Sequence, residues 1–261
     1  MIFRKRNSAV NFFAAKEYCH LIVLLCWLLV SSCDRKEAGI PMFQLVDNSG
    51  LAFINRVQDT DTINILNYRN FYNGGGVAIG DINNDGLQDV FFSGNQVSSK
   101  LYLNEGNNHF KDVTISAGVS TSTWCTGVSV VDINNDGYQD LYISVSGSVS
   151  GSARQNLLFV NNKNSTFSEK AAEYGLADTG YSTQAAFFDF DKDGDLDMCL
   201  VNHLLNGPNP NNITKKDLSG KSALNDRLYL NDGKGNYTKI ENALPDFPAN
   251  KSCVKPYDFD G

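Results

Sequence analysis

Apolar and polar residues alternate along three stretches of the chain, on both sides of a short acidic segment in each. Alternation with a period of two is typical of a strand with one buried face. We therefore expect each acidic segment to join two antiparallel strands as a hairpin. The apolar positions are Val77, Ile79, Val90 and Phe92 in the first stretch, Val128, Val130, Leu141 and Ile143 in the second, and Ala185, Phe187, Met198 and Leu200 in the third.

Each stretch continues with a second apolar signature that ends in asparagine. An aromatic residue follows six positions after that asparagine in every copy. The pattern predicts a second hairpin, and therefore four strands per unit. The three copies run from Leu101 to Asn104, from Leu158 to Asn161 and from Leu228 to Asn231, and the aromatic residues are Phe110, Phe167 and Tyr237.

The units recur at intervals that suit the blades of a propeller. The acidic segments begin at Asp81, Asp132 and Asp189, which are 51 and 57 residues apart, and a fourth copy begins 69 residues later at Asp258. Such periods exceed those of the shorter solenoid repeats. The sequence predicts an all-β fold, a β-propeller of four-stranded blades of which about three and a half are present. The expected parts are an N-terminal segment over 43–73 and a repeat region over 74–261, with blades over 74–124, 125–181 and 182–250 and the start of a fourth over 251–261.

The acidic segments place Asp or Asn at positions 1, 3, 5 and 9, with glycine at position 6. Ca²⁺ takes six to eight oxygen ligands in flexible geometry, so alternate carboxylate and amide oxygens suit it. Glycine permits the tight turn, and position 7 can offer its main-chain carbonyl. The predicted calcium ligands are Asp81, Asn83, Asp85, Leu87 and Asp89 in the first segment, Asp132, Asn134, Asp136, Tyr138 and Asp140 in the second, and Asp189, Asp191, Asp193, Asp195 and Asp197 in the third.

Electrostatic repulsion favours the calcium interpretation over a merely polar turn. Two like charges about 4 Å apart repel by roughly 4 kcal/mol at an effective dielectric constant of 20. The third segment carries one more ligand carboxylate than the others, so we expect it to bind most tightly. An EF-hand is excluded, because it needs a glutamate at position 12 and flanking helices. Position 12 is Phe92, Ile143 or Leu200.

The overall charge limits the partners. The chain of 261 residues has a formal net charge of −7 and contains three histidines. A nucleic-acid-binding protein would normally show a basic face, so we expect no nucleic-acid partner. Few histidines also make histidine-based metal sites and catalytic triads difficult to build.

The N-terminus resembles a secretion signal. A basic leader precedes a ten-residue apolar run, Leu21 to Val30, which is too short to span a bilayer as a helix. Val30-Ser31-Ser32-Cys33 resembles the lipobox of bacterial lipoproteins, which implies lipidation of Cys33. We expect a signal peptide over 1–32, a tether over 33–42, and a location in the cell envelope, attached by lipid to a bacterial membrane and facing the periplasm or the exterior. An ordinary signal peptide or a short membrane anchor is the alternative.

Three cysteines remain beyond Cys33, namely Cys125, Cys199 and Cys253. An odd number allows at most one intramolecular disulfide, so at least one buried thiol is expected. Trp124, the one tryptophan after the leader, is expected in the core.

The stretch from Gly74 to Phe92 (GGGVAIGDINNDGLQDVFF) resembles the FG-GAP repeats of the integrin-alpha propeller type. It is similar also to the VCBS-type repeats of bacterial lipoproteins, which often carry an ASPIC/UnbV domain. The resemblance covers roughly residues 43–261. It implies a β-propeller with calcium in the hairpin loops. Propellers close with four to eight blades, and the related ones have seven, so we expect the chain to be a fragment of a longer protein.

All variation in unit length falls between the second and third strands, and insertions of this kind project from one face and often carry binding. The longest runs from Asn202 to Asp226. We expect a calcium-binding module that binds a protein or a glycan and is not an enzyme, with no catalytic residues assigned. One alternative is a calcium-dependent polysaccharide lyase, whose base would come from residues such as His203, Lys215, Lys216 or Tyr181. Another is a purely structural repeat of a larger envelope protein.

Overall fold

The computed structural model describes residues 42–147, 151–203 and 225–240. The chain divides into two compact units, Met1–Val46 and Asp47–Gly261, and the description below concerns the second. The expected signal peptide, the lipidation site Cys33, the core of the long insertion and the start of a fourth blade all lie outside the described residues.

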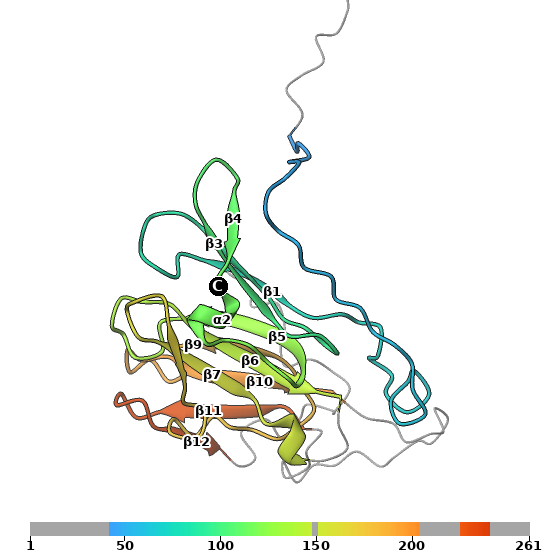
Figure 1. The fold of residues 1–261 in the computed structure, drawn as a ribbon. Helices are drawn as coiled ribbons and strands as arrows, with labels where there is room; N and C mark the ends of the chain where they lie inside the picture. Colours follow the sequence, from blue (N-terminus) through green and yellow to red (C-terminus); the bar gives the residue numbers. More distant parts are fainter. Residues whose placement is uncertain (1–41, 148–150, 204–224, 241–261) are drawn as a thin grey trace, which may run out of the picture. The chain divides into compact units, whose positions relative to one another are not determined.

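Twelve strands form three antiparallel sheets of four strands each in this part of the chain (Figure 1). The strand order is β1-β2-β3-β4, β5-β6-β7-β8 and β9-β10-β11-β12, so each sheet is a simple meander. The three sheets confirm the all-β prediction and are consistent with propeller blades. The strands are β1 (Val77–Gly80), β2 (Asp89–Phe92), β3 (Lys100–Asn104), β4 (Phe110–Asp112), β5 (Trp124–Val131), β6 (Asp140–Ser146), β7 (Leu157–Asn161), β8 (Phe167–Glu169), β9 (Ser182–Phe188), β10 (Asp197–Asn202), β11 (Arg227–Asn231) and β12 (Tyr237–Ile240).

Helical structure in the described residues is confined to two short segments, α2 (Thr114–Ala117) and the 3₁₀ turn η1 (Gly151–Arg154). Gly118 ends α2 in the left-handed conformation, with φ of 76°, which glycine adopts without steric cost. None of the described helices has the length and apolar character needed to cross a membrane.

The acidic segments join the first and second strands of their sheets, as the alternating pattern predicts. The register pairs Gly80 with Asp89, and the last residue of β5 or β9 with the first of β6 or β10 in the same way. Position 9 of every segment is therefore the first residue of a strand. Because the second hairpin of each sheet turns back beside the first, the turns after β3, β7 and β11 lie at the same end of the sheets as the acidic segments.

Two apolar clusters hold neighbouring blades together. The first joins side chains of the first and second sheets, including Phe91, Leu101 and Ile143. The second joins the second and third sheets, including Tyr142 and Met198. Face-to-face packing of this kind buries one face of each sheet against its neighbour, which is how propeller blades share their cores.

The alternating pattern predicted that Val77 and Ile79 face the core, and this prediction is wrong for the first strand. Val77 and Ile79 are 57% and 62% exposed, whereas Ala78 and Gly80 are buried. The corresponding positions in later blades, Val128 and Ala185, are buried because a preceding blade covers them. Among the described residues no blade precedes the first, so the same pattern leaves its apolar side chains in solvent.

Trp124 begins β5 and is buried in a small cluster with Tyr68 and Phe71 from the N-terminal segment, which confirms its expected place in the core. The indole lies 5.4 Å from the Tyr68 ring and 5.3 Å from the Phe71 ring, measured between centroids. This cluster lies at the opposite end of the second blade from its acidic segment. Cys125 and Cys199 are both buried, and no disulfide joins them.

Candidate calcium centres

The acidic segments, here called loop one (Asp81–Asp89), loop two (Asp132–Asp140) and loop three (Asp189–Asp197), fold in the same way. Position 6 is a glycine in the left-handed region in each loop, with φ of 86°, 84° and 99°. Position 4 is left-handed as well, with φ of 58° at Asn84, 53° at Asn135 and 66° at Lys192. Space around the three glycines is open, so backbone conformation alone selects glycine there.

The aspartate at position 1 organises each loop through its carboxylate. In loop one, Asp81 accepts hydrogen bonds from the backbone N–H groups of Asp85 and Gly86, with donor–acceptor distances of 3.0 and 2.8 Å. Loops two and three repeat both contacts, at 2.9 and 2.8 Å from Asp132 and at 3.2 Å each from Asp189. The position 5 aspartates accept the N–H of position 7. These bonds hold each loop in a fixed curve while carboxylate lone pairs stay free to bind a cation.

The aspartate at position 9 joins the loop to the third strand. Asp140 accepts the N–H of Ile133 at 3.0 Å with one oxygen and the N–H of Asn161 at 2.7 Å with the other. Asp89 and Asp197 make the matching pairs of bonds, and all three aspartates are buried. The side chain of the asparagine that ends the third strand also donates to the carbonyl of position 8 in all three blades, which explains why asparagine recurs there. Position 9 therefore builds the blade, in addition to its predicted part as a calcium ligand.

Loop three brings its carboxylates closest together. Oxygen atoms of Asp189, Asp191 and Asp197 all lie within 4.8 Å of one another. Asp193, the fourth predicted side-chain ligand, instead accepts the N–H of Asp195 at 3.2 Å. A cluster of hard, anionic oxygens fits Ca²⁺, and these are the residues that would hold it.

The loops concentrate negative charge at partly dehydrated sites. Burial, reinforced by the neighbouring carboxylates Asp136 and Asp132, raises the pKa of Asp140 to about 6. Burial and the adjacent aspartates of the same loop likewise raise the pKa of Asp89, Asp191 and Asp195. A raised carboxyl pKa means that the charged form is disfavoured, and a bound divalent cation would relieve that cost.

Loops one and two are tied to each other across the boundary between blades. The Asn84 side chain donates to the carbonyl of Gly137 at 2.9 Å. The Asn161 side chain donates to the carbonyl of Ile82 at 2.8 Å and to that of Gln139 at 3.1 Å. Loops one and two are therefore joined by direct hydrogen bonds.

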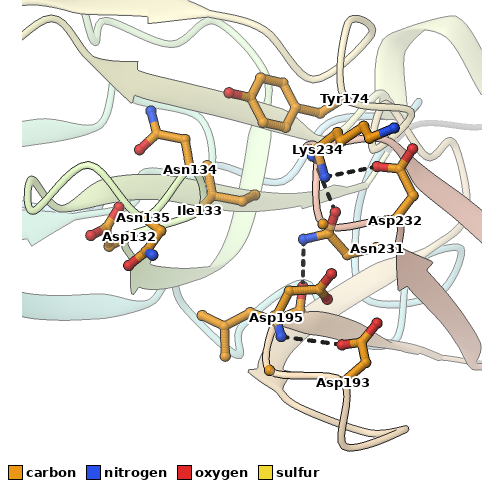
Figure 2. Close-up of a pocket in the computed structure, with 14 residues that line it drawn as sticks. Asp132, Ile133, Asn134, Asn135, Tyr174, Asp193, Asp195, Asn231, Asp232 and Lys234 are labelled. Atoms are coloured by element: carbon orange, nitrogen blue, oxygen red, sulfur yellow. Dashed lines mark hydrogen bonds between the residues drawn. The ribbon is translucent and has the colours of Figure 1, made fainter.

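A cavity of about 560 Å³ instead separates loops two and three. Figure 2 shows Asp132, Asn134 and Asn135 on one side and Asp193 and Asp195 on the other. The turn from Asn231 to Gly235 and the Tyr174 ring complete the wall. Here the Asn231 side chain donates to Leu196 within its own blade, at 3.3 Å, instead of reaching across.

A second cavity, of about 440 Å³, lies at the opposite end of the second blade. Its wall includes Tyr68, Trp124 and Ser146 and carries no charged residue. The Tyr68 hydroxyl, the Trp124 indole N–H and the Ser146 hydroxyl are buried without a formed hydrogen bond, although Ser146 faces the Tyr68 hydroxyl.

Two of the residues named for a lyase base lie together near this end. The rings of His203 and Tyr181 are 5.9 Å apart between centroids, and the backbone N–H of His203 donates to the Tyr181 carbonyl. Burial lowers the pKa of His203 to about 4. Lys215 and Lys216 lie outside the described residues.

Comparison with known proteins identifies the repeat. Residues 81–143 and 146–200 match the FG-GAP-like repeat. Cartilage acidic protein 1 of Xenopus tropicalis is 31% identical over 146 residues, which are 55% of this chain and 22% of that protein. The chain thus spans about a fifth of the length of this curated relative.

A solved structure of an Agrocybe aegerita lectin is described as recognising non-reducing terminal N-acetylglucosamine. It is 18% identical to this chain, with a TM-score of 0.37, and the match covers 64% of this chain and 37% of the lectin chain. The region from Asp81 to Leu200 therefore consists of FG-GAP-like repeats.

Proposed function

We propose that the chain is a calcium-stabilised repeat module that binds a ligand and performs no catalysis. Two observations carry this proposal: one loop geometry recurs three times, and three predicted carboxylate ligands come together in loop three. Bound Ca²⁺ would neutralise the loops and so stabilise the hairpins that join the first two strands of each blade.

The proposed ligand is a protein or a glycan. Connections between second and third strands all leave the blades at the end opposite the calcium loops, where β2, β6 and β10 finish. Long connections on one face of a rigid scaffold are a common way to build a binding surface. The proposed binding face is therefore distinct from the calcium centres, which would act by holding the blades in place.

We propose further that the chain is attached to a bacterial membrane through a lipid on Cys33, in the cell envelope. This proposal rests on the leader sequence. Expression of the full chain in a bacterial host with radiolabelled fatty acid should label the wild type and leave Cys33→Ala unlabelled. Equal labelling of both would refute the lipid anchor without affecting the calcium proposal.

Thermal unfolding tests the calcium role. Each independent site filled at 100 times its Kd adds about 2.7 kcal/mol to the free energy of unfolding. We expect the melting temperature of the full chain to rise by several degrees or more on replacing EDTA with millimolar Ca²⁺, and much less with Mg²⁺. If the chain is folded and its melting temperature is the same in EDTA and in Ca²⁺, the proposal is overturned. Asp189→Asn, Asp191→Asn and Asp193→Asn together should remove the contribution of loop three.

A further inference from the structure

Loops one and two are chemically almost the same, which makes any difference around them informative. They read Asp-Ile-Asn-Asn-Asp-Gly-Leu-Gln-Asp and Asp-Ile-Asn-Asn-Asp-Gly-Tyr-Gln-Asp, and differ only at Leu87 and Tyr138. Position 7 is predicted to bind through its main-chain carbonyl, so this difference leaves the ligand atoms unchanged. By their own residues, the two loops should bind Ca²⁺ with similar affinity.

The turn between the third and fourth strands, which lies beside each loop, differs between the blades. Two residues after the strand-ending asparagine, the first and third blades carry Gly106 and Gly233, with φ of 85° and 71°. The second blade carries Lys163 there, with φ of 64°. A side chain in the left-handed region costs roughly 1–2 kcal/mol relative to glycine. The second blade thus holds a strained lysine where its neighbours hold an unstrained residue.

The lysine side chain reaches loop two. The Nζ atom lies 3.3 Å from Oδ2 of Asp136 and 5.6 Å from the centroid of the Tyr138 ring. Asp136 is the predicted ligand at position 5, and its other oxygen is engaged by the N–H of Tyr138 at 2.9 Å. The lysine ammonium therefore contacts the oxygen of Asp136 that this bond leaves available to a cation.

We propose that Lys163 acts as a built-in competing cation for loop two, so that loop two binds Ca²⁺ more weakly than loop one. The proposal rests on the calcium role proposed above and extends it to a graded set of sites. Filling loop two requires Lys163 to leave Asp136 and to tolerate a divalent ion nearby. The expected penalty is roughly twofold to fivefold in Kd, as for an ion pair whose lysine is partly exposed.

Terbium luminescence can isolate loop two. Tb³⁺ replaces Ca²⁺ in oxygen sites and is sensitised by a nearby tyrosine, and position 7 is a tyrosine only in loop two. We would titrate Tb³⁺, and then competing Ca²⁺, into the full chain carrying Tyr174→Phe, which removes the other tyrosine that borders loop two. The same chain carries Asp189→Asn, Asp191→Asn and Asp193→Asn, which empty loop three, because the Tyr237 hydroxyl donates to the Leu196 carbonyl and would sensitise an ion bound there. Lys163→Gln should lower the Kd for Ca²⁺ by twofold to fivefold, and the gain should shrink at high salt. Lys170→Gln, which removes a lysine paired with Glu173, is the control and should change nothing.

A swap of the two sensitising residues compares the loops directly. Leu87→Tyr with Tyr138→Leu moves the luminescence signal to loop one, and we expect a lower Kd there than at loop two. Adding Gly106→Lys to that variant should weaken loop one. Unchanged binding in Lys163→Gln, with loops one and two equal, would overturn the inference while leaving the calcium module intact. Absence of Ca²⁺ competition at either loop would instead refute the proposed function.

Discussion

The two ends of the second blade differ in how their buried side chains are held. At the acidic end, strongly polar side chains are packed together, and each of the buried position 9 aspartates is satisfied by two backbone N–H groups. Around the cavity at the opposite end, the lining side chains carry no charge, and buried polar atoms of Tyr68, Trp124 and Ser146 lack formed hydrogen bonds. The acidic end is held by hydrogen bonds, whereas the Trp124 cluster is held by the packing of its rings.

The largest expected loss of stability comes from replacing Gly147, which is compared with Gly137 because the two glycines have a similar backbone conformation. Gly147 and Gly137 have φ of 81° and 84°. A Cβ atom on Gly147 would lie 2.5 Å from Cγ of Trp124, whereas one on Gly137 would meet nothing within 4 Å. Alanine at position 137 should therefore cost only the backbone strain, about 1–2 kcal/mol. Alanine at position 147 should cost roughly 2–5 kcal/mol, because overpacking is added to that strain. Urea unfolding of Gly147→Ala and Gly137→Ala in saturating Ca²⁺ measures both, and equal losses would show that the aromatic end is not tightly packed.

Removing a polar side chain should cost much more stability at the acidic end than beside Trp124. Asn161→Ala strips partners from two carbonyl groups, those of Ile82 and Gln139, and from the N–H of Lys163. We expect a loss of about 3 kcal/mol, because buried polar groups left unpaired cost about 1–3 kcal/mol each. Ser146→Ala removes a hydroxyl that has no formed hydrogen bond and should change the free energy of unfolding by less than about 0.5 kcal/mol. A large loss in Ser146→Ala would mean that a bound water satisfies this end.

The pH dependence of stability should reveal the aromatic end through His203. Its pKa is about 4 in the folded chain because burial disfavours the charged ring, against about 6.5 when unfolded. Between these values the unfolded chain binds more protons, so stability falls as the pH is lowered from 6.5 to 4, by roughly 2–3 kcal/mol in total. His203→Gln should remove this part of the slope in unfolding measurements across the window.

The raised carboxyl pKa of Asp140 acts with the opposite sign, so the difference between wild type and variant is the quantity to compare. His109→Gln is the matched control, since His109 is exposed and pairs with Glu105 on a surface turn. A slope that is unchanged in His203→Gln would contradict the assignment.

Local patterns in the sequence predicted the hairpins and loops, because the signals involved span only a few residues. Alternation sets the strands, and the spacing of Asp and Gly sets the curve between Asp81 and Asp89. Whether the metal binds stays a prediction. The hydrogen-bond partners of Asn104, Asn161 and Asn231 could not be predicted from the sequence, because these bonds join residues that come together only after folding. The constant place of these asparagines at the end of a strand was the available signal.

Contacts between blades were less predictable still. Val77 and Val128 occupy the same place in the pattern, and only the presence of a neighbouring sheet buries one and exposes the other. Lys163 likewise looks like any turn residue in the sequence. Its position over Asp136 follows from the packing of two turns that are 27 residues apart in the chain.

The smallest expected difference in stability is between two asparagines at the acidic end. Asn84 and Asn135 occupy position 4 of loops one and two with nearly the same φ, 58° and 53°, so alanine costs the same backbone strain at both. Only Asn84 reaches the next loop, through its bond to the Gly137 carbonyl, whereas Asn135 borders the cavity between loops two and three. Asn84→Ala should therefore lose about 1 kcal/mol more than Asn135→Ala in urea unfolding. The same variant should weaken the link between loops one and two, which then rests on the bond from Asn161 to the Ile82 carbonyl, so that filling loop one with Ca²⁺ changes the Tb³⁺ signal from Tyr138 less than in the wild type. Equal losses in the two variants would mean that the bond from Asn84 to the Gly137 carbonyl adds nothing measurable to the contact between the first two blades.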